Sequence, residues 1–357
     1  GTTQCFVCQA TVSEAEQRSE KYVVGKSCPH CYHTDDQSRR ETLERRNATI
    51  RSVTEPLPGS VPYENRRPIH VPGRFDGNTL IDFLVALYPF VGRKAWEEQI
   101  LNGQLRLDDR PVEASQFVTA GQRFEKIFPE TIEPDVCANI SVIAEDDWLV
   151  AVDKPAPLPV HPCGRFNRNT LISILQKIYR PQRLRLAHRL DANTSGVVLF
   201  SRTRSVARVI QPQFERGEVM KRYLARIIGR PAATHFRCDA PISSQPQMAG
   251  ARTICKNGLP ATTEFELLEH FHDGTSLVEA RPKSGRTNQI RLHLWHLGLP
   301  IQGDPMYGID HKIWPQQTVG VNDPPLCLHA RYLRIRHPHS NDEVVYQVKA
   351  PRWCLEE

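Results

Sequence analysis

The stretch His188-Arg-Leu-Asp-Ala-Asn-Thr-Ser-Gly196 places one carboxylate, Asp191, between a basic residue and a run of small residues. An apolar run, Val197-Val-Leu-Phe200, follows it directly. Small polar residues with glycine favour a turn, and a run of valine, leucine and phenylalanine favours a buried strand. A carboxylate on a loop beside a buried strand can act as a nucleophile or a base. The same pattern also fits an ordinary salt-bridged corner.

Strand-like runs continue around this stretch and dominate the chain from Ile140 onward. Their residues are rich in valine, isoleucine, leucine and tyrosine, and they cover 148–152, 197–200, 223–228, 263–268 and 276–280. Helical patterns lie between them at 170–179 and 204–216. Many short strands with a few helices predict an α+β fold with a mixed, largely antiparallel sheet.

Length and composition narrow the class of protein. The chain has 357 residues, enough for two or three domains, and a net charge of +6, which permits an RNA partner. No run of eighteen or more apolar residues occurs, so we expect no membrane partner. No signal peptide is visible at the N-terminus. The chain begins with glycine in place of methionine, so we expect a processed, trimmed or partial chain. Six of its ten cysteines are scattered singly, which favours a reducing compartment: the cytoplasm, the nucleus or an organelle.

The other four cysteines form two close pairs, Cys5-Phe-Val-Cys8 and Cys28-Pro-His-Cys31. Four thiolates at this spacing can close a tetrahedral shell on zinc. Such a shell has no open position, so we expect a structural zinc and no catalytic metal. Two disulfides or a redox pair are the alternative.

The remaining organisation follows from composition. We expect a zinc-ribbon-like segment and a charge-rich, solvated helix over 1–50, and a proline-rich linker over 51–72. A small α+β module covers 73–130, with two helices, a strand, a turn and another strand, and with Arg93 and Lys94 on its basic surface. The strand-rich domain covers 135–357.

Seven blocks of the last domain, taken in order, closely resemble the RluA-type pseudouridine synthases. Besides the Asp191 block they are Glu145–Pro155, His161–Thr170, Lys221–Ala225, Pro282–Leu294 and Gly303–Gly308, with Leu328-His-Ala330 completing the series. The His161 block is similar to a variant in the eukaryotic-type branch that acts on tRNA. Two departures occur, because Asn288 stands where the family commonly has histidine and Ala192-Asn193 replaces a charged pair.

The resemblance implies isomerisation of uridine to pseudouridine in structured RNA without a catalytic cofactor. We expect the protein to be a monomer. It implies that Asp191 is the nucleophile or base, that Arg291 pairs with it, and that Tyr223 stacks on the uracil. It also implies that Arg189 occupies the gap left by a flipped uridine and that Leu292 closes the pocket beside the base. A contact between Arg189 and a phosphate is the alternative.

The module over 73–130 separately resembles a small S-four-like RNA-binding domain, which often precedes the catalytic domain in RluA-type enzymes. Arg93 and Lys94 would then contact phosphates. A generic α+β domain with an ordinary basic surface is the alternative. We expect a tRNA substrate, with the anticodon stem-loop favoured and rRNA possible.

Two other function classes fit parts of the chain. One is a catalytically silent RNA-binding or RNA-folding protein, against which the intact Asp191, Tyr223 and Arg291 argue. The other is a zinc-ribbon module attached to an unrelated hydrolase. No Gly-x-Ser-x-Gly elbow frames Ser195 and no glycine-rich phosphate loop is present, so the hydrolase is disfavoured.

Overall fold

The computed structural model describes residues 13–19, 36–247, 250–315 and 318–355. The chain divides into two units, one formed by Gly1–Pro58 with Asp135–Glu357 and the other by Gly59–Pro134. The four N-terminal cysteines, Cys5, Cys8, Cys28 and Cys31, lie outside the described residues, so the zinc site stays a prediction. Within the described ranges, no helix is both long and apolar enough to cross a membrane.

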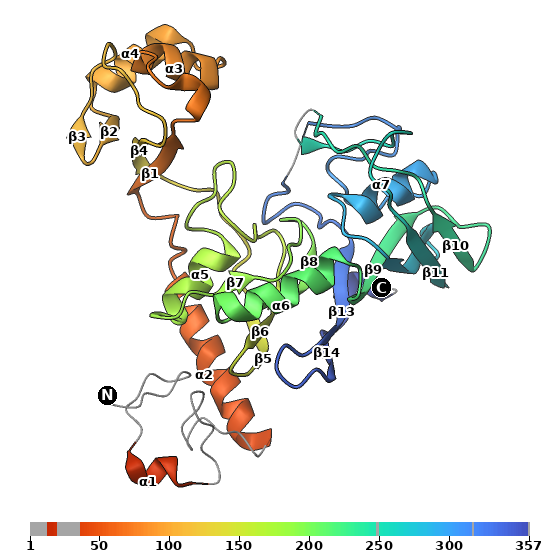
Figure 1. The fold of residues 1–357 in the computed structure, drawn as a ribbon. Helices are drawn as coiled ribbons and strands as arrows, with labels where there is room; N and C mark the ends of the chain where they lie inside the picture. The colour runs from red at the N-terminus through yellow and green to blue at the C-terminus, as the bar shows by residue number, and fades with distance from the viewer. Residues whose placement is uncertain (1–12, 20–35, 248–249, 316–317, 356–357) are drawn as a thin grey trace. The chain divides into compact units, whose positions relative to one another are not determined.

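The larger unit is built on a mixed sheet that contains ten strands in the described part of the chain (Figure 1). The strand order is β10-β11-β12-β9-β13-β8-β6-β5, with β14 paired to β13 and β7 paired to β8. Its strands are β5 (Ser141–Glu145), β6 (Leu149–Lys154), β7 (Arg185–Leu186), β8 (Ser195–Ser201), β9 (Met220–Ile228), β10 (His235–Cys238), β11 (Thr263–His270), β12 (Thr275–Pro282), β13 (Leu328–Arg336) and β14 (Glu343–Gln347). The pairing of β13 with β8 is parallel and the other pairings in this sheet are antiparallel. The predicted α+β class with a largely antiparallel sheet is confirmed.

Helices cover this sheet, and α6 lies against β7 and β8 (Figure 1). The helices of the unit are α1 (Glu14–Gln17), α2 (Asp36–Thr54), α5 (Leu171–Ile178), α6 (Arg204–Glu215), α7 (Gln289–His296) and the short 3-10 helix η3 (Arg352–Cys354). Threonine begins two of them, because the hydroxyls of Thr170 and Thr203 accept hydrogen bonds from Ser173 N and Val206 N. The predicted helices at 170–179 and 204–216 are therefore present.

The charge-rich N-terminal helix differs from the solvated helix that the sequence suggested. Ile50 of α2 is fully buried in the core formed by β6, β8 and α5. Asn47 pairs with the backbone of the edge strand β5, accepting from Val142 N at 2.7 Å and donating to Val142 O at 3.4 Å. Arg46 Nε contacts Glu145 Oε1 at 3.1 Å. A few well-spaced contact residues are enough to dock a helix, so a low average hydrophobicity concealed the docking face.

Truncating Ile50 should destabilise the larger unit. We expect Ile50→Ala to lower the free energy of unfolding by about 2–4 kcal/mol, because it removes buried methyl groups and leaves a cavity. Urea denaturation followed by circular dichroism measures this change. The neighbouring exposed residue provides the control, and Arg51→Ala should change stability by less than about 0.5 kcal/mol. Equal effects from both variants would contradict the docking of α2.

The smaller unit has its own four-stranded sheet in the order β1-β4-β2-β3. Its elements are β1 (Tyr63–His70), the 3-10 helix η1 (Gly73–Phe75), α3 (Leu80–Leu87), α4 (Arg93–Leu101), β2 (Leu105–Leu107), β3 (Arg110–Pro111) and β4 (Arg123–Thr131). Trp96, Phe83 and Phe124 fill its core. The helix-helix-strand-turn-strand order expected over 73–130 is present, while its likeness to an S-four module stays a prediction.

Residues 51–72 are not the linker that their prolines suggested. Helix α2 continues to Thr54, and Tyr63–His70 forms strand β1, which pairs antiparallel with β4. Pro68 is accommodated because β1 lies at the edge of the sheet. A strand at the edge has one side without a partner strand, so a proline without an N–H can be tolerated there. The proline content therefore led to a predicted start of the smaller unit at residue 73, whereas the unit begins at Gly59.

Candidate active site

Asp191 lies on the short connection between β7 and β8. Thr194 N donates to Asp191 O at 3.1 Å, which closes the turn that the small residues predicted. The side chain of Asp191 is 37% exposed, so a substrate can reach its carboxylate.

Gly196, the last residue of the quoted stretch, has a specific steric role. A Cβ at this position would lie 2.2 Å from Ala330 O, and its φ is +115°. Only glycine allows β8 to pass this close to β13 in this conformation. The end of the stretch therefore fixes where the Asp191 loop leaves the sheet.

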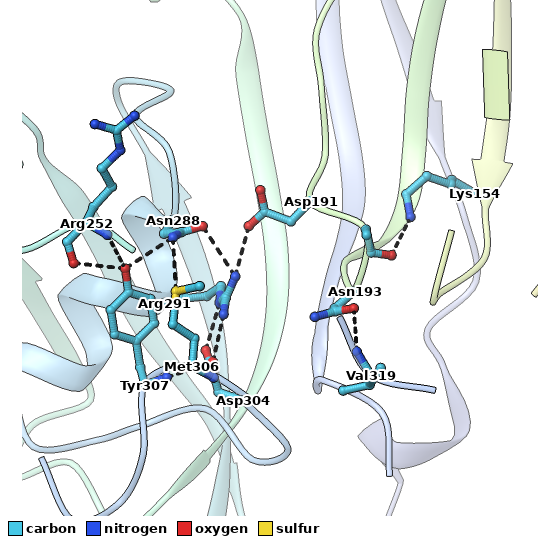
Figure 2. Close-up of polar contacts among 11 residues, drawn as sticks. Lys154, Asp191, Asn193, Arg252, Asn288, Arg291, Asp304, Met306, Tyr307 and Val319 are labelled. Carbon is cyan, nitrogen blue, oxygen red and sulfur yellow. Dashed lines mark hydrogen bonds and ion pairs between the residues drawn. The ribbon is translucent and has the colours of Figure 1, made fainter. Parts of the chain in front are cut away.

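Arg291, from helix α7, faces Asp191 from the other side of the site (Figure 2). Its Nη1 lies 3.3 Å from Asp191 Oδ2, so the expected ion pair is present. A shorter and bidentate contact joins Arg291 to Asp304, with Nε–Oδ2 at 2.8 Å and Nη2–Oδ1 at 2.7 Å. Arg291 is 3% exposed, and Asp304 is its main partner. A buried guanidinium gripped at two atoms can present its third nitrogen to Asp191 in a fixed orientation.

Asp304 is itself held by the loop that carries it. Its Oδ1 accepts from the backbone N–H groups of Met306 and Tyr307 at 2.9 and 3.0 Å. Burial tends to lower the pKa of Arg291, but the carboxylates of Asp304 and Asp191 outweigh burial and raise this pKa. The guanidinium is therefore a permanent positive charge next to Asp191.

Asn288, one of the departures from the family pattern, connects this cluster. It begins α7 with φ of +58°, a left-handed conformation that asparagine tolerates better than most residues. Its Oδ1 accepts from Arg291 Nη1 at 3.3 Å and its Nδ2 donates to Tyr307 Oη at 3.2 Å. An uncharged amide thus bridges the arginine and a buried phenol without titrating.

Lys154 holds the Asp191 loop from the side opposite to Arg291 (Figure 2). It ends β6 and is completely buried. Its Nζ donates to the carbonyl oxygens of Pro155, Leu158 and Ala192 at 2.9, 2.9 and 3.1 Å. Burial lowers the pKa of Lys154 to about 7, and the carboxylate of Asp191 opposes this shift. One ammonium group thereby ties the residue after Asp191 to the loop that follows β6.

Replacing Lys154 should loosen the Asp191 loop. We expect Lys154→Met to lower the free energy of unfolding by about 2–4 kcal/mol, because buried carbonyl groups lose their donor. Thermal or urea unfolding measures this. Lys312→Met is the matched control, since Lys312 is 79% exposed and should tolerate the same change within about 0.5 kcal/mol. An unchanged stability in Lys154→Met would show that the loop does not depend on this ammonium.

Asn193 anchors the same loop to a third segment. Its Oδ1 accepts from Val319 N at 3.2 Å, and it is 1% exposed. The second departure from the family pattern, Ala192-Asn193, therefore supplies a backbone acceptor for Lys154 and a side-chain acceptor for Val319 (Figure 2).

Tyr223 lies on β9, where it packs against two core clusters of this unit, and it is partly buried. Burial raises its pKa, and the negative charge of Asp191 raises it further. The phenol consequently stays protonated at neutral pH. A neutral aromatic ring close to the carboxylate suits stacking and hydrogen-bond donation.

The other predicted residues take different positions. Arg189 is exposed, and its Nη1 lies 3.3 Å from His161 Nε2. Leu292 is completely buried in a cluster with Met306 and Tyr307, so it packs behind the Arg291 cluster. Arg93 and Lys94 are exposed at the start of α4 in the smaller unit, where Arg93 pairs with Asp82. The roles predicted for these side chains stay predictions.

Ser195 and His329 form a second polar pair next to the loop. Their strands β8 and β13 place them opposite each other, with Oγ and Nδ1 2.8 Å apart. Burial lowers the pKa of His329 to about 4. A histidine that is 3% exposed has little room to exchange protons with a substrate, so the pair favours a structural role over a serine nucleophile.

Asp304 and Lys154 were not assigned a role from the sequence. Both lie in blocks that were quoted for the resemblance, Gly303–Gly308 and Glu145–Pro155. The signal for Lys154 is a lysine that directly follows a buried apolar run and one aspartate, Leu149-Val-Ala-Val-Asp153, because a lysine in such a strand is seldom buried without hydrogen-bond partners.

The chain is similar to known proteins of one family. A model described as RNA pseudouridylate synthase matches residues 148–296. Over 236 residues the chain is 36% identical to the human pseudouridylate synthase RPUSD2, covering 66% of this chain and 43% of that protein. Over 303 residues it is 31% identical to ribosomal large subunit pseudouridine synthase D of Nitrosomonas europaea, covering 82% and 87% respectively.

The solved structure of human RNA pseudouridylate synthase domain containing 1 is also similar. It matches with a TM-score of 0.50 and 27% identity, covering 62% of this chain and 87% of that one. The chain spans less than half the length of human RPUSD2 but most of the Nitrosomonas protein. The matched region of the family model contains both the Asp191 loop and Arg291. This chain belongs to the RNA pseudouridylate synthase family.

Proposed function

We propose that this protein converts uridine to pseudouridine within structured RNA and that Asp191 is the reacting carboxylate. The observation that carries the proposal is a partly exposed carboxylate 3.3 Å from a buried guanidinium that Asp304 grips at two atoms. The reaction breaks the bond between the ribose and N1 of uracil, turns the base, forms a bond to C5 and releases the C5 proton to N1 or to solvent. It is an isomerisation, so it consumes no oxidant or reductant.

Each chemical demand has a matching side chain. Asp191 is positioned to attack the ribose or to remove a proton from it, and both roles require an accessible carboxylate. Tyr223 offers a neutral ring for the uracil and a hydroxyl for proton transfer. Arg189 is exposed two residues before Asp191, which suits insertion into the stack that the flipped uridine vacates.

The substrate that we favour is tRNA, in the anticodon stem-loop. The His161–Thr170 block supports this choice through its similarity to a tRNA-acting branch. Large-subunit rRNA is the competing substrate, because the similar Nitrosomonas protein is named for the large ribosomal subunit. Arg93 and Lys94 of the smaller unit would add sequence-independent phosphate contacts in either case.

The test uses the full chain with no added cofactor. Unmodified tRNA transcripts and unmodified large-subunit rRNA are incubated separately, and pseudouridine is measured by mass spectrometry of nucleosides. We expect pseudouridine in the tRNA. Formation in rRNA alone would reassign the substrate, and binding of both RNAs without any product would favour the catalytically silent RNA-binding protein.

A further inference from the structure

The 36 residues that precede Asp191, residues 155–190, contain no aspartate or glutamate. At the chain's average of 40 carboxylates in 357 residues, about four would be expected there. Seven cations lie in the same run, at Arg165, Arg168, Lys177, Arg180, Arg183, Arg185 and Arg189. All of these except the half-buried Arg185 are exposed. The run therefore carries a net positive charge that no carboxylate within it offsets, and in the sequence it leads directly to Asp191.

The cations at the C-terminal end of α5 gather in one place. Arg180 and Arg183 line a shallow surface hollow together with Gln176 and Pro181. Burial lowers the pKa of Lys177, and the charges of Arg168 and Arg180 lower it further, so these groups repel one another. We call Lys177, Arg180 and Arg183 the α5 cluster.

Several exposed cations elsewhere in the same unit are paired with a nearby carboxylate. Arg216 contacts Glu218 at 2.5 Å, Arg237 contacts Asp239 at 2.6 Å and Arg334 contacts Glu343 at 3.0 Å. No described carboxylate forms an ion pair with Lys177, Arg180 or Arg183. Exposed like charges that lie close together destabilise the folded state, whereas an incoming polyanion turns the same arrangement into binding energy.

We propose that the α5 cluster binds the phosphate backbone of the substrate RNA outside the nucleotide that reacts. This inference rests on the proposed function for the identity of the RNA. The hollow holds an amide and two guanidinium-bearing side chains, and guanidinium groups suit bidentate contact with phosphate oxygens. The run ends at Arg189, the residue proposed to fill the gap left by the flipped uridine. One stretch of chain would therefore contact both the RNA backbone beside the reacting nucleotide and the gap itself.

The test measures binding in an Asp191→Asn background, so that turnover does not change the RNA. The probe is an unmodified tRNA transcript at several salt concentrations. The triple variant Lys177→Gln, Arg180→Gln, Arg183→Gln is compared with a control of equal charge change, Arg216→Gln, Arg237→Gln, Arg334→Gln. We expect the first to weaken binding about 10-fold to 100-fold and to reduce the slope of log Kd against log salt by about 2, whereas the control should change Kd less than about 3-fold.

Two further variants keep the result interpretable. Lys177→Arg with Arg180→Lys and Arg183→Lys preserves charge and should bind nearly as wild type. The single change Arg180→Gln should cause part of the loss of RNA affinity. Its thermal unfolding midpoint should be unchanged, which would exclude misfolding as the cause.

Equal losses in the cluster variant and the control would overturn the proposal, because net charge alone would then explain binding. No loss in the cluster variant would also overturn it, and binding of phosphatidylserine vesicles by wild type but not by the cluster variant would assign the surface to a membrane. The proposed function can fail without this inference. If the wild-type protein makes no pseudouridine, but the cluster variant still binds RNA more weakly than the wild type, the proposed function is wrong and this inference stands.

Discussion

Asp191→Asn should abolish pseudouridine formation, with a fall of at least about 10⁴-fold in kcat, and should leave RNA binding intact. An amide of the same shape can neither attack the ribose nor accept a proton from it, and losing a reacting group typically costs this much. RNA affinity should hold or rise slightly, because the change removes a negative charge near the phosphates. Single-turnover assays on tRNA and filter binding measure the two effects.

Stability separates this result from misfolding. Arg291 keeps its bidentate partner Asp304 in the variant, so we expect a change of less than about 1 kcal/mol in the free energy of unfolding. Asp342→Asn changes an exposed carboxylate in the same unit and should keep full activity. Residual activity above about 1% in Asp191→Asn would show that another group carries the reaction.

Asp304→Asn should damage both the fold and the activity. It removes the charge that compensates a guanidinium only 3% exposed, and removing one partner of a buried ion pair costs about 3–5 kcal/mol. Each carboxylate oxygen of Asp304 accepts a hydrogen bond from Arg291. In the variant, one of these oxygens becomes an NH₂ group, which is a donor and cannot accept from the guanidinium. We expect a matching loss in urea denaturation and a fall in kcat of about 100-fold or more as Arg291 loses its orientation.

An ion pair whose carboxylate is exposed gives the control for this prediction. Asp273 Oδ2 contacts Arg226 Nη2 at 2.9 Å, but Asp273 is 47% exposed. Asp273→Asn should cost about 1 kcal/mol or less and leave kcat unchanged. If Asp304→Asn were as stable and active as Asp273→Asn, Asp304 could not be the anchor of the site.

Much of the secondary structure could be predicted because its signals are local. The run Val197–Phe200 forms part of β8, and the helical spacing over 204–216 forms α6. Prediction failed where the average composition of a segment masked the few residues that determine its structure. The composition of α2 concealed Ile50, and five prolines concealed strand β1.

The sequence by itself determined which carboxylate stands on a turn before a buried strand, and the ordered blocks indicated its family. Tertiary structure decided how that carboxylate is held. Arg291 lies 100 residues from Asp191 in the chain, and its primary partner is Asp304. Lys154 reaches the loop because the pairing of β6 with β8 places it opposite Gly196. Turn and strand preferences act between neighbouring residues, whereas the pairing of buried charges depends on strand register and burial, which exist only once the sheet has formed.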